Sequence, residues 1–194
     1  METQLSAITR LVNELLDLSR IQVGKLEYAH EMVDLNAGLK EVVEVSQSTQ
    51  TTHTIVVQHA ASPALVIGDR DRLAQVFLNL VSNAIKYAPD APLIEVALTT
   101  EASAATISVR DHGIGIPREL QGRIFERFYR AVTPQQCAFP GLGIGLYIVA
   151  EIVKHHGGTI RVESEKGKGS TFHVILPLAT SREEVTRNRE REQR

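Results

Sequence analysis

The stretch RLAQVFLNLVSNAIKY, residues 72–87, combines a helix face suited to a core with polar side chains that a core would not select. At about 100° per residue, one face of this helix is apolar and carries Leu73, Phe77, Leu80 and Ala84. Asn79, Asn83 and Lys86 follow at spacings of four and three residues and form a polar stripe beside that face. Asparagine side chains compete for backbone hydrogen bonds inside helices, so two of them on one stripe require an explanation.

A magnesium-nucleotide site would explain this polar stripe. Mg²⁺ takes oxygen ligands and is commonly shared between one or two protein oxygens, several waters and substrate phosphates. When phosphates supply the negative charge, the neutral amide oxygen of Asn83 is a sufficient protein ligand, and Lys86 can reach a phosphate as a point charge. The alternative interpretation is an ordinary amphipathic helix with a polar, solvated surface.

Composition excludes several classes of protein. The 194 residues are 43% hydrophobic and 23% charged, which suits one domain with a core plus an appendage. A net charge of −2 without a basic block provides no electrostatic basis for binding nucleic acid. Because no apolar run approaches the roughly 18 residues of a membrane span and no signal peptide is visible, we expect a soluble, cytoplasmic chain without membrane contact. Cys137 is the only cysteine, so a reducing compartment fits.

The N-terminal third predicts two helices. Residues 1–23 carry a near-heptad apolar stripe of Leu5, Ile8, Val12 and Leu15, flanked by Leu11 and Leu18. We expect this helix to pair with another helix, and the alternative is that it folds back on its own domain. Residues 24–33 indicate a linker. Asp34 then predicts the N-cap of a helix whose apolar positions are Leu35, Leu39, Val42 and Val43.

Alternating apolar residues predict six short strands, at 54–58, 64–67, 93–98, 105–110, 159–165 and 171–178. The third and fourth form a hairpin. Residues 118–128 predict a short helix, and a further helix begins within residues 141–146. The adjacent His155 and His156 near its end favour an interaction with the helix dipole over zinc binding. The charged tail, residues 179–194, has no apolar stripe and is expected to be solvated.

Two glycine-rich segments add candidate binding groups. In residues 111–117, DHGIGIP, glycines following a strand expose backbone amides, and Asp111 can accept the exocyclic amine of adenine, although a simple turn would look the same. Residues 129–140 lack periodicity and contain two prolines, which predicts a functional lid. They lead into residues 141–146, GLGIGL, where amides at a helix start favour phosphate. Neither the P-loop nor the dinucleotide fingerprint matches.

In this order, the segments resemble the ATP-binding catalytic domain of sensor histidine kinases. Residues 79–87 resemble the asparagine box of that family, residues 111–117 its first glycine box and residues 124–128 its phenylalanine box. Residues 141–146 and 167–172 resemble the remaining two boxes. The likeness extends to about Leu178. It implies an α+β fold, a two-layer α/β sandwich of the Bergerat type with helices on one face of a mixed sheet, formed by residues 34–178.

The resemblance also implies roles for individual residues. Asn83 would ligate Mg²⁺, Asn79 and Lys86 would lie beside the phosphates of ATP, and Tyr87 near the nucleoside. Asp111 would bind the adenine amine. The base pocket would include Gly113, Gly115 and Ile116, with Thr171 acting through water. Arg127 and Arg130 are candidates for contact with the terminal phosphate. Gly141, Gly143 and Gly145 would let the lid close over the phosphates, and the nucleotide would also be bound by Leu142, Ile144 and Leu146.

Residues 1–23 resemble the second helix of the family's dimerisation hairpin. The first helix, with its phosphoacceptor histidine, does not occur here, and His30-Glu31 is followed by a different pattern in the linker. We therefore expect that the chain cannot phosphorylate itself by the usual route, and that it is a fragment of a larger kinase or a partner that lacks its own acceptor. The implied reaction is γ-phosphoryl transfer to a histidine on a dimerisation domain, and then to an aspartate on a response regulator receiver domain. A homodimer of the whole protein is implied as well.

Three other functions remain open from the sequence. ATP-hydrolysing machines of the gyrase, heat-shock chaperone and mismatch-repair type share the implied fold, but they carry a glutamate one turn before the magnesium asparagine. That position is Asn79 here, and an amide cannot act as a general base. The second alternative is a non-catalytic nucleotide-binding scaffold, which the intact boxes disfavour. Serine-directed kinases that regulate sigma factors are the third, and the N-terminal helix disfavours them.

Overall fold

The computed structural model describes residues 2–23, 27–131 and 141–179, with the backbone alone for residues 2–8, 10 and 22. Four α-helices are present among these residues: α1 Glu2–Gln22, α2 Leu35–Ser48, α3 Arg70–Tyr87 and α4 Gly145–His155. The strands are β1 Glu31–Asp34, β2 Thr54–Gln58, β3 Leu65–Gly68, β4 Leu93–Glu101, β5 Ala104–Asp111, β6 Thr159–Glu165 and β7 Gly169–Pro177.

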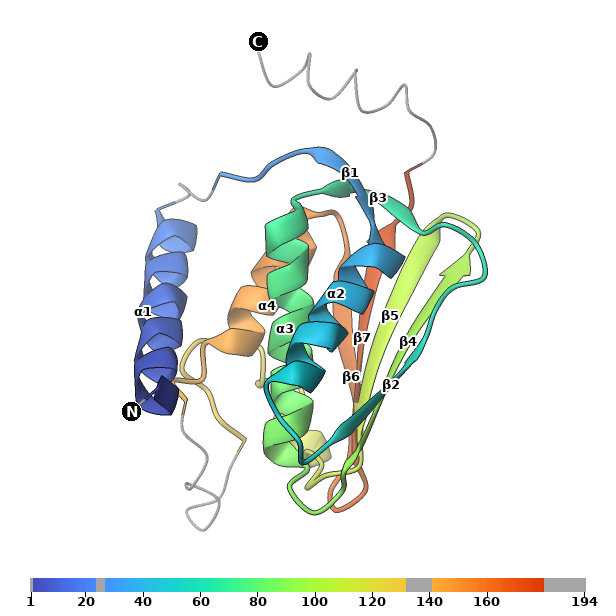
Figure 1. Cartoon of the computed structure of the whole chain (residues 1–194). Helices are drawn as coiled ribbons and strands as arrows, with labels where there is room; N and C mark the ends of the chain where they lie inside the picture. Colours follow the sequence, from blue (N-terminus) through green and yellow to red (C-terminus); the bar gives the residue numbers. More distant parts are fainter. Residues whose placement is uncertain (1, 24–26, 132–140, 180–194) are drawn as a thin grey trace.

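The main sheet is mixed and has five strands in the order β2-β4-β5-β7-β6. β2 runs parallel to β4, and all other neighbours are antiparallel. Helices α2, α3 and α4 cover one face of this sheet (Figure 1). β1 and β3 form a separate antiparallel pair. The predicted two-layer α/β sandwich with helices on one face is therefore confirmed.

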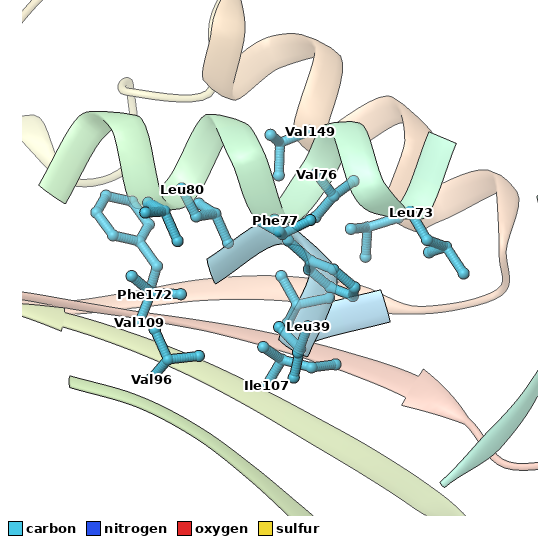
Figure 2. Close-up of a cluster of buried hydrophobic side chains, with 14 of the residues drawn as sticks. Leu39, Leu73, Val76, Phe77, Leu80, Val96, Ile107, Val109, Val149 and Phe172 are labelled. Atoms are coloured by element: carbon cyan, nitrogen blue, oxygen red, sulfur yellow. The ribbon is translucent and has the colours of Figure 1, made fainter. Parts of the chain in front are cut away.

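The core lies between α3 and the inner face of the sheet (Figure 2). The predicted apolar face of α3 is buried: Leu73, Phe77 and Leu80 are each 1% exposed. Opposite them, alternate residues of the central strands point inward, and the register places Val109 beside both Val96 and Phe172. Because α3 is anchored along its whole apolar face, the polar stripe beside that face has a defined position.

Two aspartates begin the helices that follow β1 and β3. The Asp34 carboxylate accepts a hydrogen bond of 2.9 Å from the Asn36 amide, as predicted for an N-cap. Asp69 caps α3 by accepting a hydrogen bond of 3.0 Å from the Arg72 amide, and its second oxygen accepts one of 2.9 Å from the Ala29 amide. Asp69 therefore also attaches the segment after α1 to the start of α3.

Some sequence-based expectations were wrong in detail. The expected linker, residues 24–33, ends in β1, because pairing with β3 satisfies its backbone groups. Residues 118–128 do not form an α-helix. Only a 3₁₀ turn at Arg118–Leu120 forms, followed by turns. Residues 132–140 of the expected lid and residues 180–194 of the expected tail lie outside the described residues.

Helix α1 packs back on its own chain, beside α4 (Figure 1). Its inward side includes Asp17 and Leu18, which are 7% and 6% exposed. Val12 and Leu15, two members of the predicted stripe, are instead about half exposed, so the buried face is rotated from the expected one. No helix in the described part of the chain has the length and apolarity needed to cross a membrane.

Candidate functional site

A pocket lies beside the C-terminal half of α3, between that helix, the start of α4 and the end of β5. Its empty volume is about 1020 Å³, which includes space open to solvent. We refer to it as the α3 pocket. Its wall contains most of the residues singled out from the sequence: Asn79, Asn83, Lys86, Tyr87, Asp111, Gly115, Ile116, Arg130, Gly141, Leu142, Gly143, Gly145 and Leu146.

The polar stripe of α3 forms one wall of this pocket. Asn79, Asn83 and Lys86 all line it and are half-buried. The Lys86 Nζ lies 4.8 Å from the centre of the Tyr87 ring, within cation-π range. The stripe therefore faces a concave site rather than open solvent, which favours the functional interpretation over a merely solvated helix face.

Asp111, the last residue of β5, lies at another part of the wall and is 5% exposed. Burial raises the pKa of its carboxyl group, while hydrogen bonds from the Gly113 and Ser170 amides act in the opposite direction. The Gly113 amide donates to Asp111 Oδ1 at 2.9 Å. A buried carboxylate with acceptor capacity left in a pocket can recognise an N–H donor such as an exocyclic amine.

The turn after Asp111 is held against the β6–β7 turn by close backbone packing. Gly115 has φ +63°, and a Cβ there would lie 2.0 Å from the Glu165 carbonyl oxygen, so only glycine fits. The Gly167 amide donates 2.8 Å to the Ile114 carbonyl. The Ile116 amide donates 2.7 Å to Ser164 Oγ. Two glycine-rich segments far apart in sequence thus form one rigid end of the pocket.

The segment before α4 approaches the α3 stripe from the other side. A Cβ built on Gly145, the first residue of α4, would lie 3.5 Å from Asn79 Oδ1. One built on Gly141 would lie 3.1 Å from Lys86 Nζ. The N-terminus of α4 therefore lies next to amide and ammonium groups of α3. Unpaired amides at a helix start carry partial positive charge and suit an anion.

The two predicted arginines have different positions. Arg130 lines the pocket and hydrogen bonds with the Tyr87 phenol, whose pKa is raised by burial in spite of that arginine. Arg127 is exposed and lies outside the wall, with its guanidinium 5.3 Å from the centre of the Tyr147 ring. In this conformation, Arg130 alone of the two can meet a ligand in the pocket.

Three other predicted residues also lie outside the wall. A Cβ on Gly113 would be 2.0 Å from the Tyr87 carbonyl oxygen, so this glycine packs the turn against the end of α3. Ile144 is fully buried in the core. Thr171 pairs with Arg110 of β5 and lines a second groove, which shares Asp111 and Ser170 with the α3 pocket. Their contribution to a ligand site would be indirect here.

The pocket wall also contains residues that were not singled out as site residues: Glu14, Ser82, Ile114, Ile124, Tyr129, Ala131, Ser170 and Phe172. Most of them belong to the quoted boxes or adjoin them, so their neighbours were a usable signal. Glu14 had no such signal. It comes from α1 and reaches the wall only because that helix packs back on the domain.

The adjacent histidines at the end of α4 are structural. His156 Nδ1 lies 2.8 Å from the Ile152 carbonyl, and its Nε2 accepts from the Asp69 amide at 2.9 Å. The His155 ring stacks on Tyr28 at 3.6 Å. Among the described residues, no group of three His, Cys, Asp or Glu side chains could hold a metal ion.

Comparison with known proteins identifies the class to which this fold and pocket belong. Residues 68–180 match the family model described as histidine kinase-, DNA gyrase B- and HSP90-like ATPase, and the chain belongs to that family. Within it, the similar proteins are sensor histidine kinases, and the domain is of their ATP-binding catalytic type.

Particular relatives support this assignment. The sensor histidine kinase WalK of Bacillus subtilis is 31% identical over 186 residues, which are 94% of this chain and 30% of WalK. The sensor-like histidine kinase SenX3 of Mycobacterium tuberculosis is 38% identical over 86% of this chain and 41% of SenX3. The chain thus spans less than half the length of these curated relatives.

Solved structures agree. The mycobacterial sensor histidine kinase MprB matches with a TM-score of 0.67 and 31% identity, covering 77% of this chain and 98% of that one. Full-length ShkA in complex with AMPPNP matches with a TM-score of 0.73 and 29% identity over 90% of this chain and 36% of ShkA.

Proposed function

We propose that the α3 pocket binds Mg²⁺-ATP and presents its γ-phosphoryl group for transfer to a histidine nitrogen. The observation that carries this proposal is that one pocket combines the buried Asp111 carboxylate with a separate cluster of Asn79, Asn83, Lys86 and the start of α4. Asp111 suits the adenine amine, and the cluster suits a triphosphate with its metal. Gly115 keeps the base end closed against the β6–β7 turn.

The donor set fits magnesium rather than a transition metal. Neutral amide oxygens on one helix wall are adequate when the substrate phosphates bring the remaining charge, and Asn83 would be the principal ligand. When bound, the ion neutralises charge on the β- and γ-phosphates. Lys86 and Arg130 add positive charge from two sides of the same pocket, and Tyr87 orients Arg130 through its hydrogen bond.

The acceptor histidine would come from another segment or chain. None of the 7 histidines, all of them within described regions, lines the pocket. His30 lies near His155, at the far end of α4 from Gly145. Ten residues of helix separate those ends by roughly 15 Å, which is too far for direct transfer. We infer that the phosphoryl group passes to a histidine of a dimerisation domain and then to a receiver-domain aspartate, in the cytoplasm.

The arrangement on α3 argues against efficient hydrolysis by the same pocket. One turn before Asn83 the helix carries Asn79, whose amide cannot take a proton from water. The chain should therefore hold ATP without rapid turnover until an acceptor is supplied. A degenerate scaffold is disfavoured because Asp111, Asn83 and Lys86 all lie in one wall.

The proposal is tested by calorimetric titration with Mg²⁺-ATP of the unmodified chain, Asn83→Ala and Asp111→Asn. We expect saturable binding heat, weakened at least tenfold by each substitution, as for a lost ligand or charged hydrogen bond. Asn13→Ala and Asp90→Asn, both at exposed positions, are matched controls and should bind normally.

Three results would contradict the proposal: no binding, equal effects of site and control substitutions, or steady ADP release after saturation. Phosphohistidine on the chain after incubation with ATP, detected by acid-labile label, would contradict the external acceptor.

A further inference from the structure

Helix α1 turns a defined face toward the catalytic domain. Along this face, Leu11, Glu14 and Ile21 are half-buried, and Asp17 and Leu18 are buried. Their spacing of three and four residues is that of one helix face. The opposite face carries Val12 and Leu16, each about half exposed. The side of α1 that meets the domain therefore includes two acidic residues among apolar ones.

Asp17 joins α1 to α3 through a buried polar network. Its Oδ1 accepts a hydrogen bond of 2.9 Å from Arg72 Nη1, and its Oδ2 accepts one of 2.7 Å from Gln75 Nε2. Arg72 Nη1 also donates 2.9 Å to Gln75 Oε1. The Asp17 and Arg72 side chains are only 10% and 20% exposed. Removing one partner from a buried pair leaves an uncompensated charge, so this contact depends strongly on all three groups.

One turn before Asp17, Glu14 contributes to the wall of the α3 pocket. Three residues of helix place the two acidic groups roughly 4.5 Å apart along the axis, on the same side of α1. Asp17 is bonded to the first turns of α3, while Glu14 shares the pocket with Lys86 and Arg130. The network that holds α1 in place therefore also holds an acidic residue in the wall of a pocket that suits a triphosphate.

We propose that docked α1 is an inhibitory state of the nucleotide site. In this state the Asp17–Arg72–Gln75 network keeps the Glu14 carboxylate in the pocket wall, where it repels the phosphates and weakens ATP binding. Release of α1 removes this charge. Because linkage is reciprocal, ATP binding in turn favours release of α1. This inference rests on the proposed function, since it requires that ATP binds in the α3 pocket.

The test compares Mg²⁺-ATP affinity by calorimetry and amide hydrogen exchange over residues 11–21 in four proteins: the unmodified chain, Asp17→Asn, Glu14→Gln and Glu41→Gln. Glu41 is the matched control, because its ion pair with Arg70 also reaches the first turn of α3, but both of these side chains are 60% exposed. We expect Asp17→Asn to accelerate exchange in α1 and to tighten ATP binding about tenfold, the effect of removing one like charge from a partly solvated site.

Glu14→Gln leaves the Asp17–Arg72–Gln75 network intact and tests the negative charge of Glu14 alone. It should tighten ATP binding about as much while α1 stays protected, and Glu41→Gln should change neither property. Weaker binding by Glu14→Gln would overturn the proposal, since it would make Glu14 a favourable ligand. Faster exchange in Asp17→Asn without tighter binding would overturn it too. If the unmodified chain does not bind Mg²⁺-ATP, or if Asn83→Ala binds it equally well, the proposed function is refuted instead.

Discussion

Gly115 offers a sharp test of how the 111–117 turn and the β6–β7 turn form one end of the α3 pocket. Its backbone has φ +63°, and a Cβ there would lie 2.0 Å from the Glu165 carbonyl oxygen. In Gly115→Ala, the left-handed conformation costs about 1 kcal/mol. The clash involves backbone on both sides, so the 111–117 turn and the β6–β7 turn must separate.

Separation would break two specific hydrogen bonds. These join the Gly167 amide to Ile114 at 2.8 Å and the Ile116 amide to Ser164 at 2.7 Å. At about 1 kcal/mol each, with the backbone strain, the total loss is about 3 kcal/mol of the free energy of unfolding. Because the same turn carries the amide that binds Asp111, we also expect ATP binding to weaken more than stability alone would require.

Urea unfolding and ATP calorimetry measure the two effects separately. Gly122→Ala is the matched control, since a Cβ at that exposed position meets nothing within 4 Å, and its midpoint should stay within the error of the unmodified chain. A Gly115→Ala protein with an unchanged urea midpoint and unchanged ATP affinity would refute the account of this turn.

Two further predictions concern stability away from the pocket. Gly38→Ala should raise the free energy of unfolding by about 0.5 to 1 kcal/mol, because Gly38 lies inside α2 and its new Cβ would come no closer than 3.9 Å to Phe77; a lower urea midpoint would contradict this. Burial lowers the pKa of His156, with further lowering by His155 and His30 against the opposing effects of Ile152 and Asp69. The neutral ring is therefore favoured in the folded state, so stability is complete above the unfolded pKa of about 6.5 and falls as pH drops below it. His156→Gln should reduce the fall of the urea midpoint between pH 7 and pH 5. His59→Gln, at an exposed position, should leave that pH dependence unchanged.

Helix periodicity was sufficient to predict the central helix and its two stripes. Leu73, Phe77 and Leu80 are buried as expected, because the 3.6-residue repeat places them on one side whatever the tertiary context. The N-cap at Asp34 was equally local, since its partner is two residues away. Most of the predicted pocket residues also line one pocket. Each box could be recognised locally, because it is a short segment, whereas the packing of α3, β5 and α4 brings the boxes together.

Long-range packing decided the features that the sequence did not reveal. The strand β1 within the expected linker exists because β3, more than thirty residues later, pairs with it. Residues 118–128 have helix-compatible spacing, yet they form turns, and Ile124 among them is buried and lines the pocket.

The position of α1 is the clearest case. Its near-heptad stripe predicted a packed helix, and α1 does pack, but Val12 and Leu15 of that stripe are about half exposed. A stripe does not say which partner the helix meets or which side is turned inward. The answer depends on Asp17, whose charge is tolerated in a buried position only because Arg72 and Gln75 lie opposite it. Those residues are more than fifty positions away, so their juxtaposition is a property of the folded chain. The sequence by itself determined the helix and the boxes and predicted the class of ligand. Tertiary structure alone brought Glu14 to the α3 pocket, because α1 and that pocket are joined only by packing.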